Sequence, residues 1–207
     1  MKLDKNVFLA SAGLLIVIMV LSVVYYLPKL KSENAFYYKE DPLKKNSNLG
    51  LKGGESLTYL YYYKDSPEER MNITYRVLKN FGCVSFEAVE FQTSSGCIDQ
   101  QGNDRNGSNL SLSNQFIDFY KPWMLAVEDG WNWKVRRISS VGGETTLNTY
   151  FFSAKGIENL NGLDAYRVEV SLDGRDNVTL WVDAKRRISI RQEQKGFITE
   201  LADLNNK

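Results

Sequence analysis

The residues that most often carry out catalysis are missing or unsuitably spaced in this sequence of 207 residues. The chain contains no histidine, which excludes Ser-His and Cys-His nucleophile pairs, histidine-ligated zinc and imidazole acid-base catalysis. No Ser-x-x-Lys motif occurs, and Gly53-Gly54 and Gly142-Gly143 fit turns rather than a phosphate-binding loop. The sequence therefore predicts a protein that is not an enzyme and that needs no cofactor.

Paired carboxylates of the glycosidase type are the remaining catalytic candidates. Glu87 and Glu90 are three positions apart in a predicted strand, so their side chains point to opposite faces. Glu128 and Asp129 precede Gly130 and fit the end of a helix followed by a turn. We therefore expect neither pair to meet across a substrate.

A calcium site is the other chemical candidate, in the loop DQQGNDRNGSN. Its oxygen ligands would be Asp99, Asn103, Asp104 and Asn106. Their spacing differs from that of a twelve-residue calcium loop, and no bidentate glutamate closes the set. A solvated, glycosylated loop fits this stretch better, and no metal site is predicted.

Asn-x-Ser/Thr sequons occur at Asn72, Asn106, Asn109 and Asn177. Such motifs accept glycans only on a chain that is exported past a membrane, although composition alone would supply about two of them by chance. Asn72 and Asn177 fall on the polar face of their predicted strands, where a glycan has room. The sequons therefore favour export only in combination with other signals.

Cys83 and Cys97 are the only cysteines of the chain. As a pair in an exported domain they suit an oxidising compartment, where a disulfide closing this short loop would contribute about 3 kcal/mol. Two reduced, buried cysteines are the alternative.

Residues 7–27, VFLASAGLLIVIMVLSVVYYL, form an uncharged apolar stretch. As a helix it would span roughly 31 Å, the thickness of the hydrocarbon core of a bilayer. Tyr25 and Tyr26 end it with interfacial side chains, and Pro28 follows. A cleaved signal peptide is the alternative, but the stretch is too long and no small-x-small cleavage site follows it. The sequence predicts an uncleaved transmembrane helix in contact with the lipid bilayer.

The predicted orientation places the bulk of the chain outside the cell. Lysines flank both ends of the apolar stretch, so the positive-inside rule does not decide the orientation. The cysteines and sequons favour a cytoplasmic N-terminus. The net charge of +1 gives no indication of a nucleic-acid partner. The prediction is a single-pass cell-surface protein with a cytoplasmic tip (1–6), a transmembrane helix (7–27), a linker (28–54) and an extracytoplasmic β-rich domain (55–207).

Apolar and polar residues alternate with period two through the C-terminal part of this domain, with hairpin signals at Asp173-Gly174 and Lys195-Gly196. This pattern predicts an antiparallel meander with one apolar face. That face is the candidate ligand-binding surface, and its residues are Tyr166, Val168, Val170, Val178, Leu180, Val182, Ile188 and Ile190.

The middle of the domain is less regular. Residues 56–64, 71–79 and 84–92 are rich in aromatic and β-branched side chains and predict strands. Helix-like spacing from Phe116 to Val127, interrupted by Pro122, predicts one or two short helices. The fold class is mainly β with a short helical insertion: a curved antiparallel, half-barrel-like sheet that follows one transmembrane helix.

The block GIENLNGLDAYRVEVSLDGRDNVTLWVDAKRRISIRQEQ resembles the C-terminal block of the LolA-like superfamily of lipoprotein carriers and sensors. The matching positions are Gly162, Ala165, Tyr166, Trp181, Val182, Asp183, Ile188 and Arg191. The resemblance implies a half-barrel with helices against its concave face and a role in handling an apolar ligand or lipoprotein. Family carriers are released from the membrane or lipid-anchored, whereas this chain has a predicted membrane helix, so the resemblance does not identify the ligand.

Two functional hypotheses follow. In the first, the apolar face of a tethered half-barrel binds a lipid or an apolar segment. In the second, the chain is a structural or accessory subunit of a membrane or cell-surface complex, and its helix packs with those of a membrane-protein partner. A face filled by residues 112–129 favours the second, and an open cavity of several hundred Å³ favours the first.

Aromatic side chains could also line a ligand groove or a sugar platform. The alternative is that they belong to the core and rim of the sheet. These residues are Tyr59, Tyr61, Tyr62, Tyr63, Trp123, Trp131 and Trp133.

Overall fold

The computed structural model describes residues 35–80, 82–94, 96–101, 119–141 and 144–205. The predicted cytoplasmic tip, the predicted transmembrane helix and the sequons Asn106 and Asn109 lie outside these residues. Within the described ranges, no helix has both the length and the apolar character needed to cross a membrane.

The described chain is almost entirely β-structure, with a single short 3-10 helix, η1 (Pro122–Ala126). The strands are β1 (Ala35–Glu40), β2 (Ser56–Tyr63), β3 (Ser66–Asn80), β4 (Cys83–Ala88), β5 (Thr93–Ser94), β6 (Ile98–Asp99), β7 (Asn132–Val141), β8 (Glu144–Leu160), β9 (Leu163–Leu172), β10 (Arg175–Asp183), β11 (Ser189–Gln194) and β12 (Phe197–Asn205). The mainly β prediction is confirmed.

These elements fall into two compact units. The larger unit comprises residues 38–136 and 148–207 and holds most of the strands, η1 and the core. The smaller comprises residues 1–37 and 137–147, and among its described residues the hydroxyls of Ser139 and Thr146 form a hydrogen bond. The sections below concern the larger unit.

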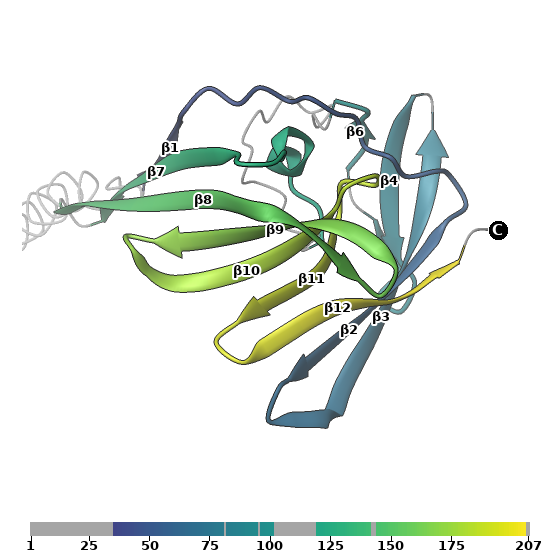
Figure 1. Cartoon of the computed structure of the whole chain (residues 1–207). Coiled ribbons are helices and arrows are strands. Elements are labelled where there is room, and N and C mark those ends of the chain that lie inside the picture. Colours follow the sequence, from purple (N-terminus) through teal and green to yellow (C-terminus); the bar gives the residue numbers. More distant parts are fainter. Residues whose placement is uncertain (1–34, 81, 95, 102–118, 142–143, 206–207) are drawn as a thin grey trace, which may run out of the picture. The chain divides into compact units, whose positions relative to one another are not determined.

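The described strands follow the order β1-β7-β8-β9-β10-β11-β12-β2-β3-β4-β5, and β6 pairs with β4. The pairings from β8 along the order to β5, and that of β4 with β6, are antiparallel, as predicted. In the larger unit, the strands from β9 to β3 curve around one side, and η1 lies over that side (Figure 1). The order ends at β1 and β5, so the sheet is open and not a closed barrel.

The predicted hairpins are present with the expected turns. Asp173 and Gly174 have φ angles of 49° and 72°, and Lys195 and Gly196 have φ angles of 49° and 81°. Positive φ at both central residues defines the type I′ turn, whose twist matches that of the flanking strands. Next to the first turn, Arg175 lies opposite Leu172. A one-residue shift between Arg175 and Val178 then changes the register, and it is this shift that brings Val168 opposite Leu180.

The helical prediction is only partly confirmed. The stretch from Phe116 to Val127 was expected to form one or two helices, and its described part contains only η1. Pro122 begins the element, and all the residues from Trp123 to Val127 are buried. Because this segment is buried on all sides, it lacks the polar face of an amphipathic surface helix. It forms only a short 3-10 helix, and 3-10 helices are seldom longer.

Part of the predicted linker belongs to the folded unit. Leu49 and Leu51 are buried, at 6% and 7% exposure. The amide of Leu49 donates to the carbonyl of Gln100, and the amide of Gly50 donates to that of Arg186. The chain from Leu49 onward is therefore packed structure and not a free spacer.

Candidate functional site: the apolar face and its cover

The predicted ligand-binding face exists as a continuous surface of the sheet. Residues of β9 and β10 oppose one another in register, with Val170 opposite Val178 and Tyr166 opposite Val182. Ile188 and Ile190 extend the surface at the start of β11, and both are buried. The sequence pattern identified this surface because successive side chains of a strand alternate between faces.

This surface is filled by the protein's own side chains. Trp123, Met124 and Val127 pack in one cluster with Val168 and Leu180, and none of these five is exposed by more than 6%. Packed interiors have no room for a further apolar chain. Within the described residues, this half of the predicted site is core.

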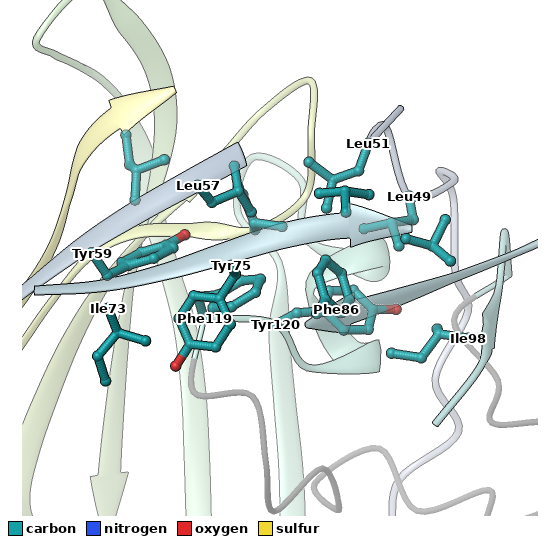
Figure 2. Close-up of a cluster of buried hydrophobic side chains, with 14 of the residues drawn as sticks. Leu49, Leu51, Leu57, Tyr59, Ile73, Tyr75, Phe86, Ile98, Phe119 and Tyr120 are labelled. Carbon is teal, nitrogen blue, oxygen red and sulfur yellow. The ribbon is translucent and has the colours of Figure 1, made fainter. Parts of the chain in front are cut away.

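The other half is filled in the same way (Figure 2). Phe119 stacks on Tyr59 at 4.9 Å between ring centroids, and meets Tyr75 and Phe86 edge-on at 4.8 Å and 5.1 Å. Ile188 belongs to the same buried cluster. The sequence places Phe119 only within the stretch of helix-like spacing from Phe116 to Val127. Its position in the middle of this cluster depends on contacts with strands that are distant along the chain.

We call residues 123–127, which pack on the apolar face, the cover. A buried arginine links this cover to the sheet. Arg187, which is 9% exposed, donates through Nη1 to the carbonyl of Val127 at 2.6 Å. Its guanidinium carbon lies 5.2 Å from the centroid of the Tyr166 ring. A backbone carbonyl and an aromatic face are both favourable neighbours of a guanidinium. Tyr166, predicted to contact a ligand, contacts this arginine instead.

Three of the residues that carry the family resemblance, Asp183, Trp181 and Arg191, make structural contacts. The carboxylate of Asp183 is buried, accepts the amides of Lys185 and Arg186 at 2.7 Å each, and pairs with the Arg186 guanidinium at 3.2 Å. It therefore holds the β10–β11 turn. On the polar face, Trp181 donates to Glu158, and Arg191 lies 5.7 Å above the Trp181 ring.

The acidic candidates are engaged in ordinary contacts. Glu87 pairs with Arg76 at 3.2 Å, and Glu90 accepts the backbone amide of Thr74. Glu128 accepts the side-chain amide of Asn46 at 2.7 Å. In the part of the chain that the structure describes, no cluster of acidic or cysteine side chains could hold a metal ion.

Cys83 and Cys97 form a disulfide, with their Cα atoms 5.6 Å apart. The prediction of a bridge between them is confirmed. The bond ties β4 to the segment that leads into β6, whose Asp99 pairs with Cys83 in the sheet. The described part of the chain contains no free cysteine.

Of the sequon residues, Asn72 lies in β3 and is exposed. Asn177 lies in β10, and its side chain is not among those described. The structure thus provides one solvent-facing asparagine for a glycan.

Three tyrosines have a raised pKa, and for Tyr120 the main cause is burial, with the charge of Asp99 as a lesser cause. Burial, with like charge from Tyr61, Tyr75 and Asp183 as lesser causes, raises the pKa of Tyr59 well above its usual value. Burial also raises the pKa of Tyr62, and the hydrogen bond that its hydroxyl donates to Glu200 adds to the shift. All three phenols therefore stay protonated at neutral pH.

A partly exposed apolar patch lies at the edge of the core, where β2, β3 and β12 meet, and its Phe197 is half-buried against the core. Tyr63 and Met71 are 60% and 50% exposed. The rings of Tyr63 and Phe197 lie 5.2 Å apart, and Met71 pairs across the strands with Tyr61. We call Tyr63, Met71 and Phe197 the hairpin patch. Clustered exposed apolar side chains are typical of interaction surfaces.

Comparisons with known proteins give little guidance. No protein-family model matches the sequence, and no curated protein matches it. Among solved structures, the chain is similar to the hypothetical lipoprotein YmcC from Escherichia coli (K12), with a TM-score of 0.35 and 15% identity over 75% of this chain and 89% of that one. A superposition this loose supports no inference about function.

Proposed function

We propose that the chain is a membrane-anchored, non-catalytic interaction module that works outside the cytoplasm as a structural or accessory subunit of a membrane or cell-surface complex. Residues 7–27 would anchor it, with the N-terminus in the cytoplasm. The disulfide between Cys83 and Cys97 and the exposed sequon at Asn72 support the outside location.

The observation that carries this proposal is the filled apolar face. A carrier would have to displace Trp123, Met124 and Leu125 before a lipid could lie there, and all three are buried. Exposing each of these large side chains would cost about 1.5–3 kcal/mol. A docking role needs no such rearrangement, because the hairpin patch is already exposed.

The resemblance to LolA-like carriers then concerns the architecture of the sheet and does not imply that this chain carries a ligand. The matching residues Asp183 and Trp181 hold a turn and a polar face together. We propose a half-barrel-like architecture of that superfamily's kind, in which the concave side is permanently occupied.

Site-specific photocrosslinking of the full-length chain in its own membrane tests the docking role. A photoreactive residue replacing Met71 is expected to give one discrete, light-dependent adduct with a membrane-protein partner. The matched control replaces Arg175, which is exposed at the start of β10. Equal products from both positions, or no product from position 71, would contradict docking through the hairpin patch.

The lipid-binding reading predicts a different result. Native mass spectrometry of the gently extracted full-length chain would then show a lipid that is retained within the folded unit and lost on organic extraction. We expect the protein mass with its disulfide and any attached glycans, and no such lipid. A retained lipid would restore the carrier hypothesis.

The proposed orientation is tested separately, by adding a protease to intact cells that express the chain. We expect the folded unit to be digested or released while the anchor stays in the membrane. Protection until the cells are opened would place the unit in the cytoplasm.

A further inference from the structure

A small polar hollow lies beside the cover of the sheet, away from the hairpin patch. Its volume is about 230 Å³. One wall is formed by residues of the segment 42–46, which precedes Leu49. The other is formed by residues of the segment 126–132, between η1 and β7. The residues that matter for its chemistry are Lys44, Asn46, Glu128, Trp131 and Asn132.

Backbone hydrogen bonds hold the two walls together. The amide of Asp41 donates to the carbonyl of Lys134 at 3.0 Å, and the amide of Asn46 donates to that of Leu125 at 3.1 Å. The indole of Trp133 donates to the carbonyl of Asp41 at 2.9 Å. The hollow is therefore preformed, and a ligand would find its shape without ordering a loop.

The aromatic member of the hollow is held rigidly. The ring of Trp131 is half-buried and lies within 8° of parallel to that of Trp123, with 5.8 Å between centroids. Its backbone donates to Glu128 and accepts from Ala154. Trp133 also stacks on this ring, with 6.1 Å between centroids, so the part of the indole that remains exposed is the part that borders the hollow. An indole that is fixed in this way offers that exposed apolar part and one N–H donor at little entropic cost.

The polar members are only partly satisfied. The side-chain amide of Asn46 donates to Glu128 at 2.7 Å, and that of Asn132 donates to the carbonyl of Gly130 at 2.9 Å. Among the described residues, the ammonium of Lys44, the indole N–H of Trp131 and the amide oxygens of both asparagines have no partner. The hollow thus presents two donors and several acceptors around one aromatic ring.

From this arrangement we propose that the hollow binds one pyranose unit of a glycan. A sugar ring has an apolar C–H face for the indole, and hydroxyls that both donate and accept. One ammonium and one carboxylate, from Lys44 and Glu128, nearly cancel, which favours an uncharged sugar. The hollow is smaller than the roughly 300–1,000 Å³ of sites for drug-sized ligands, as suits a single ring. Sugar binding rests on the proposed function in one respect. That function places the folded unit outside the cytoplasm, where glycans are abundant.

The test is saturation-transfer NMR on the full-length chain with methyl glycosides of glucose, galactose, mannose and N-acetylglucosamine. The detergent must lack a sugar head group, because an alkyl glycoside would itself compete. We expect at least one sugar to bind in the millimolar range, about 4 kcal/mol, as suits one small ligand. Trp131→Ala should weaken this binding at least tenfold, and Trp181→Phe, on the polar face of the sheet, should leave it unchanged.

If Trp131→Ala fails to fold, Asn132→Ala replaces it, because Asn132 is exposed, and at least a threefold loss of binding is expected. The proposal is overturned if no sugar in the panel binds, if binding survives both substitutions, or if acetylated dipeptide amides bind and the sugars do not. Crosslinking from position 71 reports on a different surface. Loss of sugar binding in Trp131→Ala with the crosslink retained would therefore separate this proposal from the docking role.

Discussion

Arg187 and Val127 are joined by a hydrogen bond of 2.6 Å between the guanidinium Nη1 and the backbone carbonyl oxygen. The bond connects the β10–β11 turn with the end of the segment that fills the apolar face. Arg187 also has a φ angle of 63°, which is unusual for a residue with a side chain. The sheet thus uses a strained turn residue to fasten its own cover.

Replacing Arg187 with Met should loosen this cover. The substitution keeps an apolar stem but leaves the Val127 carbonyl without its charged donor, and we expect the free energy of unfolding to fall by about 1.5–3 kcal/mol. Urea unfolding measures the loss, and hydrogen exchange should quicken at Met124, whose amide donates to the carbonyl of Lys121. The matched control is Arg175→Met, at the exposed first residue of β10. Equal stability of the two variants would show that the Arg187 bond does not hold the cover.

The tight approach of the predicted linker to the β10–β11 turn gives a second prediction. A Cβ atom on Gly50 would lie 2.3 Å from the carbonyl oxygen of Lys185, a backbone atom that cannot rotate away. Gly50→Ala should therefore destabilise the protein by about 1–3 kcal/mol, the usual range for overpacking. Thermal unfolding checks this, with Asn48→Ala as the exposed control. A melting temperature that is the same in both variants would mean that residues 49–51 are not packed as described.

The disulfide gives a third prediction. Replacing both Cys83 and Cys97 with Ser should lower the free energy of unfolding by about 3 kcal/mol, because the unfolded chain regains the freedom of the loop. Denaturant unfolding of the double variant, compared with the oxidised parent, measures this. Reduction of the parent should give the same shift. A parent whose stability does not respond to reductant would show that the bridge is absent in the isolated protein.

The alternating strands could be predicted from the sequence because successive side chains of a strand face the core and the solvent in turn. Val168, Leu180 and Val182 were expected to face inward, and all three are buried. The Asp173-Gly174 turn predicted the hairpin, but the one-residue shift between Arg175 and Val178 that sets the final pairing left no signal in the sequence. Period-two patterns and Gly-containing turns are local, so a single sequence reveals them.

What covers the sheet could not be predicted in the same way. The residues from Trp123 to Val127 are buried without interruption, so they carry no periodicity that separates helix from irregular cover. Leu49 and Leu51 are two apolar residues among polar ones and glycines, too short a signal to distinguish packed chain from linker. The sugar-binding candidate joins Asn46 to Glu128 across 82 residues, and only the folded chain brings them together.

The buried phenol of Tyr59 gives the last prediction, on stability at alkaline pH. Burial raises the pKa of Tyr59 well above the usual tyrosine value of about 10. The stability that this shift provides is therefore complete below pH 10 and is lost as the pH rises from 10 toward the folded-state pKa. Tyr59→Phe removes the titration and the 2.7 Å hydrogen bond to the Ser189 carbonyl. We expect this variant to be about 1 kcal/mol less stable at pH 7 and to lose less stability between pH 9 and pH 12 than the parent. Urea unfolding across this range measures both effects, with Tyr63→Phe as the exposed control. Parallel stability curves for parent and Tyr59→Phe would show that the Tyr59 hydroxyl ionises in the folded protein as readily as in water, and so is not enclosed by Phe119.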